Sequence, residues 1–181
     1  MFRMISKLIM KWWGWKYDID LIEWPKKYIV AVVPHTSSWD FPLGIFTRSI
    51  FGQDIKFIGK KSLFPPVLGA IMKAMGGYPV DRSKSNNFVQ AVVDVFDSKD
   101  EFKIAIAPEG TRDAVKHLKT GFYFIAKGAN IPILLCRFDW GNKIISFSKP
   151  FYPTADQSAD FEYIENHFRG VKGYHHTKSF I

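Results

Sequence analysis

A histidine and an aspartate at positions 35 and 40 are the first residues of this chain that could carry out chemistry. Histidine exchanges protons near neutral pH, and a carboxylate bound to one ring nitrogen leaves the other nitrogen free to act as a base. This spacing does not place two side chains on one face of a continuous helix. His35 and Asp40 can therefore meet only if His35 lies in a turn and Asp40 in the first turn of a following helix. Asp40 also fits a purely structural role, because Ser37 and Asp40 have the spacing of a helix capping box.

A second group of polar residues, at positions 109–112, could bind an anionic or hydroxylated substrate. The guanidinium of Arg112 can hold two oxygens of a phosphate or a carboxylate, Gly110 lets the backbone approach a ligand, and Thr111 offers a hydroxyl. Glu109 would repel a phosphate. We therefore expect Glu109 either to orient Arg112 or to bind a hydroxyl of the acceptor.

Both polar groups follow apolar runs that predict buried strands. Residues 28–33 run into His35, and residues 102–107 run into Glu109. Functional sites of open α/β sheets lie beyond the carboxyl ends of the strands, so we expect the two groups to converge there. The stretch 42–51 predicts a helix that begins with a proline, which is tolerated only near a helix start. This places the aspartate of the first group at the start of that helix.

The rest of the chain alternates between strand-like and helix-like patterns, without internal repeats or an interdomain linker. This alternation predicts an α/β fold, a single domain over residues 17–181 with a mixed, largely parallel sheet flanked by helices. The further strands are expected at 55–59, 78–81, 131–138 and 143–148, and the further helices at 65–75, 85–98, 120–128 and from residue 156 onward.

Four short motifs of this chain resemble those of the glycerolipid acyltransferases, the family typified by 1-acyl-glycerol-3-phosphate acyltransferase. They are a His-x-x-x-x-Asp motif, a Gly-x-x-x-x-Asp-Arg-like motif, a Pro-Glu-Gly-Thr-Arg motif and a hydrophobic-Pro-hydrophobic motif. The matching stretches occur in the order of the family, at 35–40, 76–82, 108–112 and 131–133. From the first motif to the last they span residues 35–133, about half of the chain.

The resemblance implies an O-acyltransferase that works without a cofactor or metal. The fatty acyl group would pass from acyl-CoA or an acyl carrier protein to the hydroxyl of a lysophospholipid acceptor. The first expectation for that acceptor is 1-acyl-glycerol-3-phosphate, and the product would be phosphatidic acid. The resemblance gives a catalytic role to His35 and Asp40, and an acceptor-binding role to Arg82, Glu109, Gly110, Thr111 and Arg112. Arg82 could alternatively form a surface ion pair with Asp81 beside a turn.

The chain departs from the family pattern near three of the motifs. Pro34 stands where an asparagine is frequent, and Ala107 and Pro79 stand where aromatic residues are frequent. These differences leave the chemistry intact and concern the acceptor. A lyso-form of an aminolipid is therefore an alternative acceptor, and Arg112 would then bind a carboxylate.

No covalent nucleophile accompanies the histidine and aspartate, because the sequence lacks a Gly-x-Ser-x-Gly elbow. We expect His35 to activate the acceptor hydroxyl directly, with backbone amides of the His35 turn stabilising the oxyanion. A thioesterase, which uses water in place of the alcohol, fits the same pair. A lipid-binding protein without catalysis, in which the two motifs only cap and turn, is the remaining alternative.

Composition favours a folded protein with an acidic partner. Of the 181 residues, 47% are hydrophobic, which excludes a disordered chain, and the formal net charge is +8. The basic residues are dispersed rather than massed on one predicted helix, so nucleic acid is not an expected partner. The single cysteine, Cys136, cannot form a disulfide within the chain, and we interpret it as a small buried side chain.

Residues 1–16 predict an amphipathic helix with a broad apolar face. That face is flanked by Arg3, Lys7 and Lys11, and the apolar run is too short and too interrupted to cross a bilayer. Such a helix is typical of the membrane interface, where it would bind an anionic membrane surface. We therefore expect a peripheral protein on the cytoplasmic face of the membrane. The alternative is an ordinary helix docked on the domain core.

Overall fold

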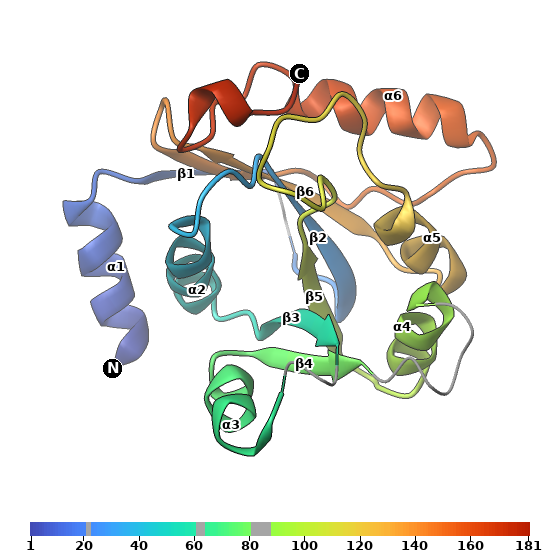
Figure 1. Cartoon of the computed structure of the whole chain (residues 1–181), viewed down its shortest axis with the longest axis horizontal. Coiled ribbons are helices and arrows are strands. Elements are labelled where there is room, and N and C mark those ends of the chain that lie inside the picture. The colour runs from blue at the N-terminus through green and yellow to red at the C-terminus, as the bar shows by residue number, and fades with distance from the viewer. Residues whose placement is uncertain (21–22, 61–63, 81–87) are drawn as a thin grey trace.

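The structure, a computed structural model, describes the chain apart from residues 21–22, 61–63 and 81–87. The described residues form one seven-stranded sheet with the strand order β1-β7-β6-β2-β5-β3-β4 (Figure 1). The strands are β1 (Lys16–Ile19), β2 (Lys27–Val33), β3 (Ile55–Lys60), β4 (Gly77–Val80), β5 (Phe102–Ile106), β6 (Ile133–Asp139) and β7 (Ile144–Phe147).

Neighbouring strands are parallel, except that β6 and β7 pair antiparallel. The expected α/β fold with a mixed, largely parallel sheet is therefore confirmed. The sequence did not predict β1. This strand is only four residues long, and it pairs at the edge of the sheet with side chains that are exposed or half-buried, so it carries no buried apolar run.

Helices cover both faces of the sheet, and the central strand β2 contributes to both cores. Ile29, Ala31 and Val33 pack into one core with α4, α5 and α6, whereas Tyr28 and Val30 pack into the other core with α1 and α2. This alternation is the period of two that strands impose on their side chains. The helices are α1 (Phe2–Trp12), α2 (Asp40–Phe51), α3 (Pro66–Ala74), α4 (Phe88–Asp97), α5 (Gly121–Gly128) and α6 (Gln157–Phe168).

Helix α1 lies beside α2 (Figure 1) and contacts the domain through only a narrow part of its surface. Ser6 and Met10 are buried, and Arg3 Nε donates a hydrogen bond to the Ile50 carbonyl oxygen at 2.8 Å. The broad apolar face of the helix points away from the domain. We call its exposed side chains the apolar stripe, which consists of Met1, Met4, Ile5, Leu8 and Trp12.

The helix of the N-terminal segment is confirmed, but it is shorter than the predicted segment. It ends at Trp12, and Gly14 follows with a positive φ of 83°. Trp15 lies beyond this turn and is buried, so it does not extend the exposed face. None of the helices in the described ranges is long and apolar enough to cross a bilayer.

Candidate active site

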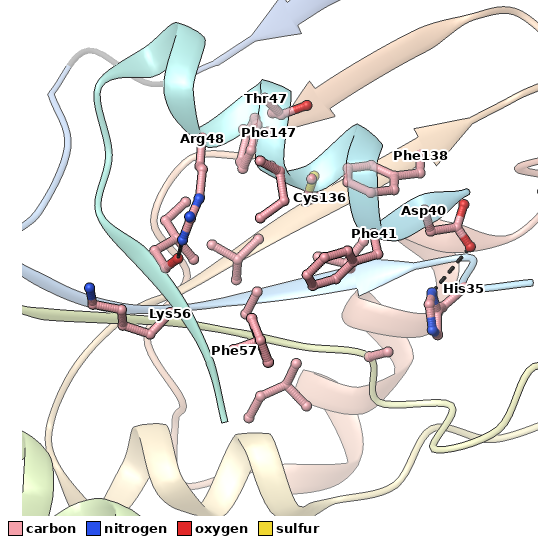
Figure 2. A pocket seen from close by; sticks show the side chains of 18 residues that line it. His35, Asp40, Phe41, Thr47, Arg48, Lys56, Phe57, Cys136, Phe138 and Phe147 are labelled. Atoms are coloured by element: carbon pink, nitrogen blue, oxygen red, sulfur yellow. Dashed lines mark hydrogen bonds and ion pairs between the residues drawn. The ribbon is translucent and has the colours of Figure 1, made fainter. Parts of the chain in front are cut away.

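His35 and Asp40 meet at the carboxyl end of β2. The strand ends at Val33, a cis peptide bond joins Val33 to Pro34, His35 lies in the following turn, and Asp40 begins α2. His35 Nδ1 lies 3.1 Å from Asp40 Oδ2 (Figure 2). The two side chains therefore meet in the way that their spacing required.

Asp40 is buried and hydrogen-bonded on both carboxylate oxygens. Its Oδ2 accepts hydrogen bonds from the backbone amides of Thr36 and Ser37, each at 2.9 Å. Its Oδ1 accepts from Trp140 Nε1 at 2.7 Å. These donors replace the hydrogen bonds to water that the carboxylate loses on burial. The bond from the Ser37 amide has the direction found in a capping box, but the N-cap residue of α2 is Trp39, so Ser37 does not cap this helix.

The second ring nitrogen of His35 is not used by the contact with Asp40. Because an ionised carboxylate only accepts hydrogen bonds, the proton of neutral His35 resides on Nδ1, and Nε2 is left as an acceptor. The side chain is 28% exposed, whereas the Asp40 side chain is 2% exposed. The pair thus combines a reachable base with a buried carboxylate that orients it.

Glu109 supports the same turn from the end of the neighbouring strand β5. It is 1% exposed, and its Oε2 accepts a hydrogen bond from the His35 backbone amide at 2.6 Å. Its Oε1 is buried and has no hydrogen-bond partner among the described residues. Burial raises the pKa of Glu109 to about 7, although the bond from His35 opposes that rise. The observed contact is neither of the two that we expected for Glu109, and its role in acceptor binding stays a prediction.

Three backbone amides of the turn are already engaged. His35 donates to Glu109, and Thr36 and Ser37 donate to Asp40. These amides cannot also stabilise an oxyanion, so the expectation that amides of the His35 turn do so is wrong for these three. No sequence pattern pointed to the bond between the His35 amide and Glu109, because these residues follow two different strands and lie 74 residues apart in the chain.

Residues 110–112 continue from Glu109 as an exposed loop. Gly110 has a φ of 65°, in the left-handed region that glycine adopts without strain, and the Lys119 side chain lies against its α-carbon. Thr111 Oγ1 accepts a hydrogen bond from the Asp113 amide at 3.3 Å. Arg112 is exposed and forms no ion pair with any residue that the structure describes, so its guanidinium is free for a ligand. Arg82 lies outside the described residues.

An apolar pocket of about 320 Å³ extends from the dyad between α2 and the sheet. His35 and Asp40 lie at one end, and Arg48 and Lys56 lie at the other (Figure 2). Arg48 Nη1 donates to the Ile55 carbonyl oxygen at 2.8 Å. The walls between these ends are almost entirely apolar and include Val30, Val32, Phe41, Ile45, Phe57, Ala105, Ile106, Cys136, Phe138 and Phe147.

Two features of this site went unnoticed in the sequence. Cys136 is buried as expected, and burial raises the pKa of its thiol, but its position in the wall of the pocket was not anticipated. Trp140 was not singled out, because it follows an ordinary strand and belongs to no motif.

In the part of the chain that the structure describes, no group of three or more His, Cys, Asp or Glu side chains could hold a metal ion.

The fold and the site define an α/β protein with a histidine–aspartate dyad at the carboxyl end of a parallel strand, facing an apolar pocket. A model of the Acyltransferase family matches residues 20–138, and the chain belongs to that family. It is therefore an acyltransferase.

Comparison with solved structures gives the same fold. The chain is similar to the crystal structure of the 1-acyl-sn-glycerophosphate (LPA) acyltransferase PlsC from Thermotoga maritima, with a TM-score of 0.62 and 19% sequence identity. The match covers 92% of this chain and 74% of the other. A search of curated proteins gives no match.

Proposed function

We propose that this protein transfers a fatty acyl group from acyl-CoA or an acyl carrier protein to the free hydroxyl of 1-acyl-glycerol-3-phosphate, which yields phosphatidic acid. The observation that carries the proposal is the 3.1 Å contact between His35 and buried Asp40 at the end of an apolar pocket. Family membership supports acyl transfer, and the chemistry of the surrounding residues supports a lipid substrate with a phosphate.

The dyad supplies the base for a direct transfer. His35 Nε2 removes the proton from the acceptor hydroxyl, and the resulting oxygen attacks the thioester carbonyl carbon. The tetrahedral intermediate then collapses, the carbon–sulfur bond breaks, and the imidazolium returns its proton to the departing sulfur. Asp40 holds the ring and stabilises its positive charge in between, because its carboxylate is fixed by three hydrogen-bond donors. General-base assistance of this kind contributes about two to four orders of magnitude in rate.

The apolar pocket is suited to the fatty acyl chain. It follows β2 from Val30 to the end of the strand at Val33, roughly 10 Å at the rise of a strand, and continues to the dyad in the turn beyond. Each methylene group that it removes from water adds about 0.8 kcal/mol of binding free energy. Arg48 and Lys56 close the far end with polar groups that a hydrocarbon chain would avoid. The pocket therefore fits a chain whose carbonyl carbon lies beside His35.

The exposed loop 110–112 is suited to the phosphate of the acceptor. It is joined through Glu109 to the His35 backbone, so it lies beside the dyad. The free guanidinium of Arg112 and the net charge of +8 favour an anionic acceptor. The Thermotoga maritima protein is described as an acyltransferase for 1-acyl-sn-glycerophosphate, which supports the same acceptor class.

The apolar stripe on α1 is suited to a membrane surface, and we propose peripheral attachment to the cytoplasmic face of an anionic membrane. Lys7 and Lys11 lie on one flank of the stripe, where they would meet lipid headgroups. Replacing Leu8 and Trp12 together by serine should release the protein from anionic vesicles in a sedimentation assay. The control is Ile181→Ser, which removes an exposed apolar side chain elsewhere. Persistent binding of the double variant would mean that another surface holds the membrane.

The proposed reaction is tested by mass spectrometry of the products. Purified protein receives long-chain acyl-CoA or acyl-ACP together with lysolipids that carry a phosphate or lack one. A diacyl product that is lost in His35→Ala, and retained in the control His176→Ala, supports the acyltransferase and identifies its acceptor. Free fatty acid alone would show a thioesterase instead. A product only from lysolipids without phosphate would overturn the proposed acceptor, and turnover independent of His35 would overturn the proposed mechanism.

A further inference from the structure

A tryptophan from a distant part of the chain binds the aspartate of the dyad. Trp140 follows β6 and is buried, and its Nε1 donates to Asp40 Oδ1 at 2.7 Å. Within the described residues Oδ1 has no other donor, whereas Oδ2 is shared by His35 and two backbone amides. The indole is therefore the group that fixes the second carboxylate oxygen, and with it the rotation of the carboxylate plane relative to the imidazole.

The indole of Trp140 is itself held by rings from both ends of the chain. Trp13 and Trp15 meet it edge to face, with ring centroids 5.6 and 4.9 Å away, and Tyr174 meets it at 4.9 Å. Lys143 Nζ lies 4.8 Å from its centroid, within the range of a cation–π contact. Edge-to-face pairs have preferred geometries, so these contacts restrict how the indole can turn.

We propose that Trp140 is a positioning residue for acyl transfer, whose indole N–H holds the Asp40 carboxylate in the orientation that His35 requires. Trp13 and Trp15 hold the indole in turn. These two residues directly follow α1, so the helix that carries the apolar stripe is connected to the dyad through packed aromatic rings. The inference rests on the proposed role of His35 as the base, and it is independent of which acceptor the enzyme uses.

Trp140→Phe removes the indole N–H and keeps an aromatic ring in the same place. A hydrogen bond to a charged group is lost, and we expect kcat to fall about tenfold while KM for donor and acceptor stays unchanged. Trp24→Phe is the matched control, because Trp24 packs in the same core, against Tyr28 and Phe147, without reaching the dyad. Its kcat should stay within about twofold of wild type. An unchanged kcat in Trp140→Phe overturns the proposal.

A double-mutant cycle separates positioning from general support of the fold. If Trp140 acts through Asp40, then Trp140→Phe introduced into Asp40→Asn should lower kcat by less than about twofold further. A second tenfold loss in that background would mean that Trp140 acts independently of Asp40, and would overturn the proposal. The cycle is measured on any turnover that depends on His35, including thioester hydrolysis.

The failure of the proposed function and the failure of this inference give different results. If His35→Ala keeps wild-type turnover, the proposed base is wrong and the inference falls with it. If His35→Ala abolishes turnover while the cycle is additive, only the inference falls.

Nuclear magnetic resonance gives a readout without a Trp140 variant. Of the six indole N–H signals, the one that donates to Asp40 should move most in Asp40→Asn, and the proposal is overturned if none moves.

Discussion

Asp40 and Glu109 are two buried carboxylates that accept hydrogen bonds from the same turn, and they have different numbers of hydrogen-bond donors. Asp40 is 4% exposed and accepts from Thr36, Ser37 and Trp140 in addition to His35. Glu109 is 1% exposed and accepts one hydrogen bond from the His35 amide, and its Oε1 finds no partner among the residues that the structure describes. Burial is thus comparable, and the number of donors differs.

The two carboxylates therefore differ in how far their hydrogen bonds compensate for the loss of water on burial. Because desolvation is only partly offset, the pKa of Glu109 rises to about 7. A protonated Glu109 can still accept the His35 amide through its carbonyl oxygen, so holding the turn does not require its charge. In the proposed mechanism Asp40 stabilises an imidazolium during turnover, and its donors fix the carboxylate for that task.

The largest effect is expected from removing the charge of Asp40. Asp40→Asn keeps the size of the side chain but cannot stabilise the imidazolium, so kcat should fall by about two to four orders of magnitude. Glu109→Gln is the matched change on the other side of the turn, and its kcat should fall far less. If Asp40→Asn and Glu109→Gln lowered kcat equally, the proposed difference between the two carboxylates would be contradicted. The measurement is single-turnover kinetics at pH 8.

The raised pKa of Glu109 predicts a pH dependence of stability. Its pKa is about 7 when folded and 4.5 as an ordinary glutamate, so the folded state holds the proton more tightly between these values. The contribution of Glu109 to the free energy of unfolding is complete below pH 4.5 and is lost as the pH rises through 7, by on the order of 3 kcal/mol. Denaturant unfolding of wild type and Glu109→Gln across this range measures it. A difference between the two that does not change with pH would contradict the prediction.

Truncating the Glu109 side chain should lower the free energy of unfolding by less than the full pH-dependent change described above. Glu109→Ala leaves the partly buried His35 amide without an acceptor, and we expect a loss of about 1–3 kcal/mol in the free energy of unfolding at pH 7. Glu109→Gln keeps an acceptor oxygen and serves as the control. If the alanine variant were as stable as the glutamine variant, the bond between Glu109 and His35 would not support the turn.

The smallest effect is expected from removing an uncharged hydrogen-bond acceptor that supports the same turn. Thr36 Oγ1 accepts a hydrogen bond from the His175 amide at 3.1 Å, which ties the C-terminal segment to the turn. Thr36→Val removes this acceptor at a partly exposed donor, so the loss should be about 1 kcal/mol or less. Thr47→Val is the control, because it makes the same substitution within α2, where the hydroxyl donates to the Leu43 carbonyl oxygen and does not support the turn. A loss larger than that of Glu109→Ala would reverse the ranking of charged and neutral supports.

Local sequence patterns were sufficient for the elements that carry the dyad. The apolar run before His35 and the proline after Asp40 predicted a strand, a turn and a helix start, and the structure has β2 and α2 there. The same holds for β5 before Glu109. These features depend on residues that are close in sequence, so their periodicity could be recognised without the fold.

The contacts that complete the site could not be predicted in the same way. Trp140 reaches Asp40 across 100 residues, and Glu109 reaches His35 across 74. Both bonds depend on strand order, because β2 lies between β5 and β6 in the sheet. The sequence determines this order only through the packing of the whole domain. The pocket arises in the same way, from α2 crossing the sheet.

Away from a bilayer, the apolar stripe on α1 would face water. Docking through Ser6 and Met10 uses the small side of the helix, which leaves Leu8 at 64% and Trp12 at 91% exposed. A contiguous apolar surface of this kind promotes association between copies in dilute buffer. The purified chain should therefore be prone to self-association, and lipid or detergent that covers the stripe should keep it monomeric.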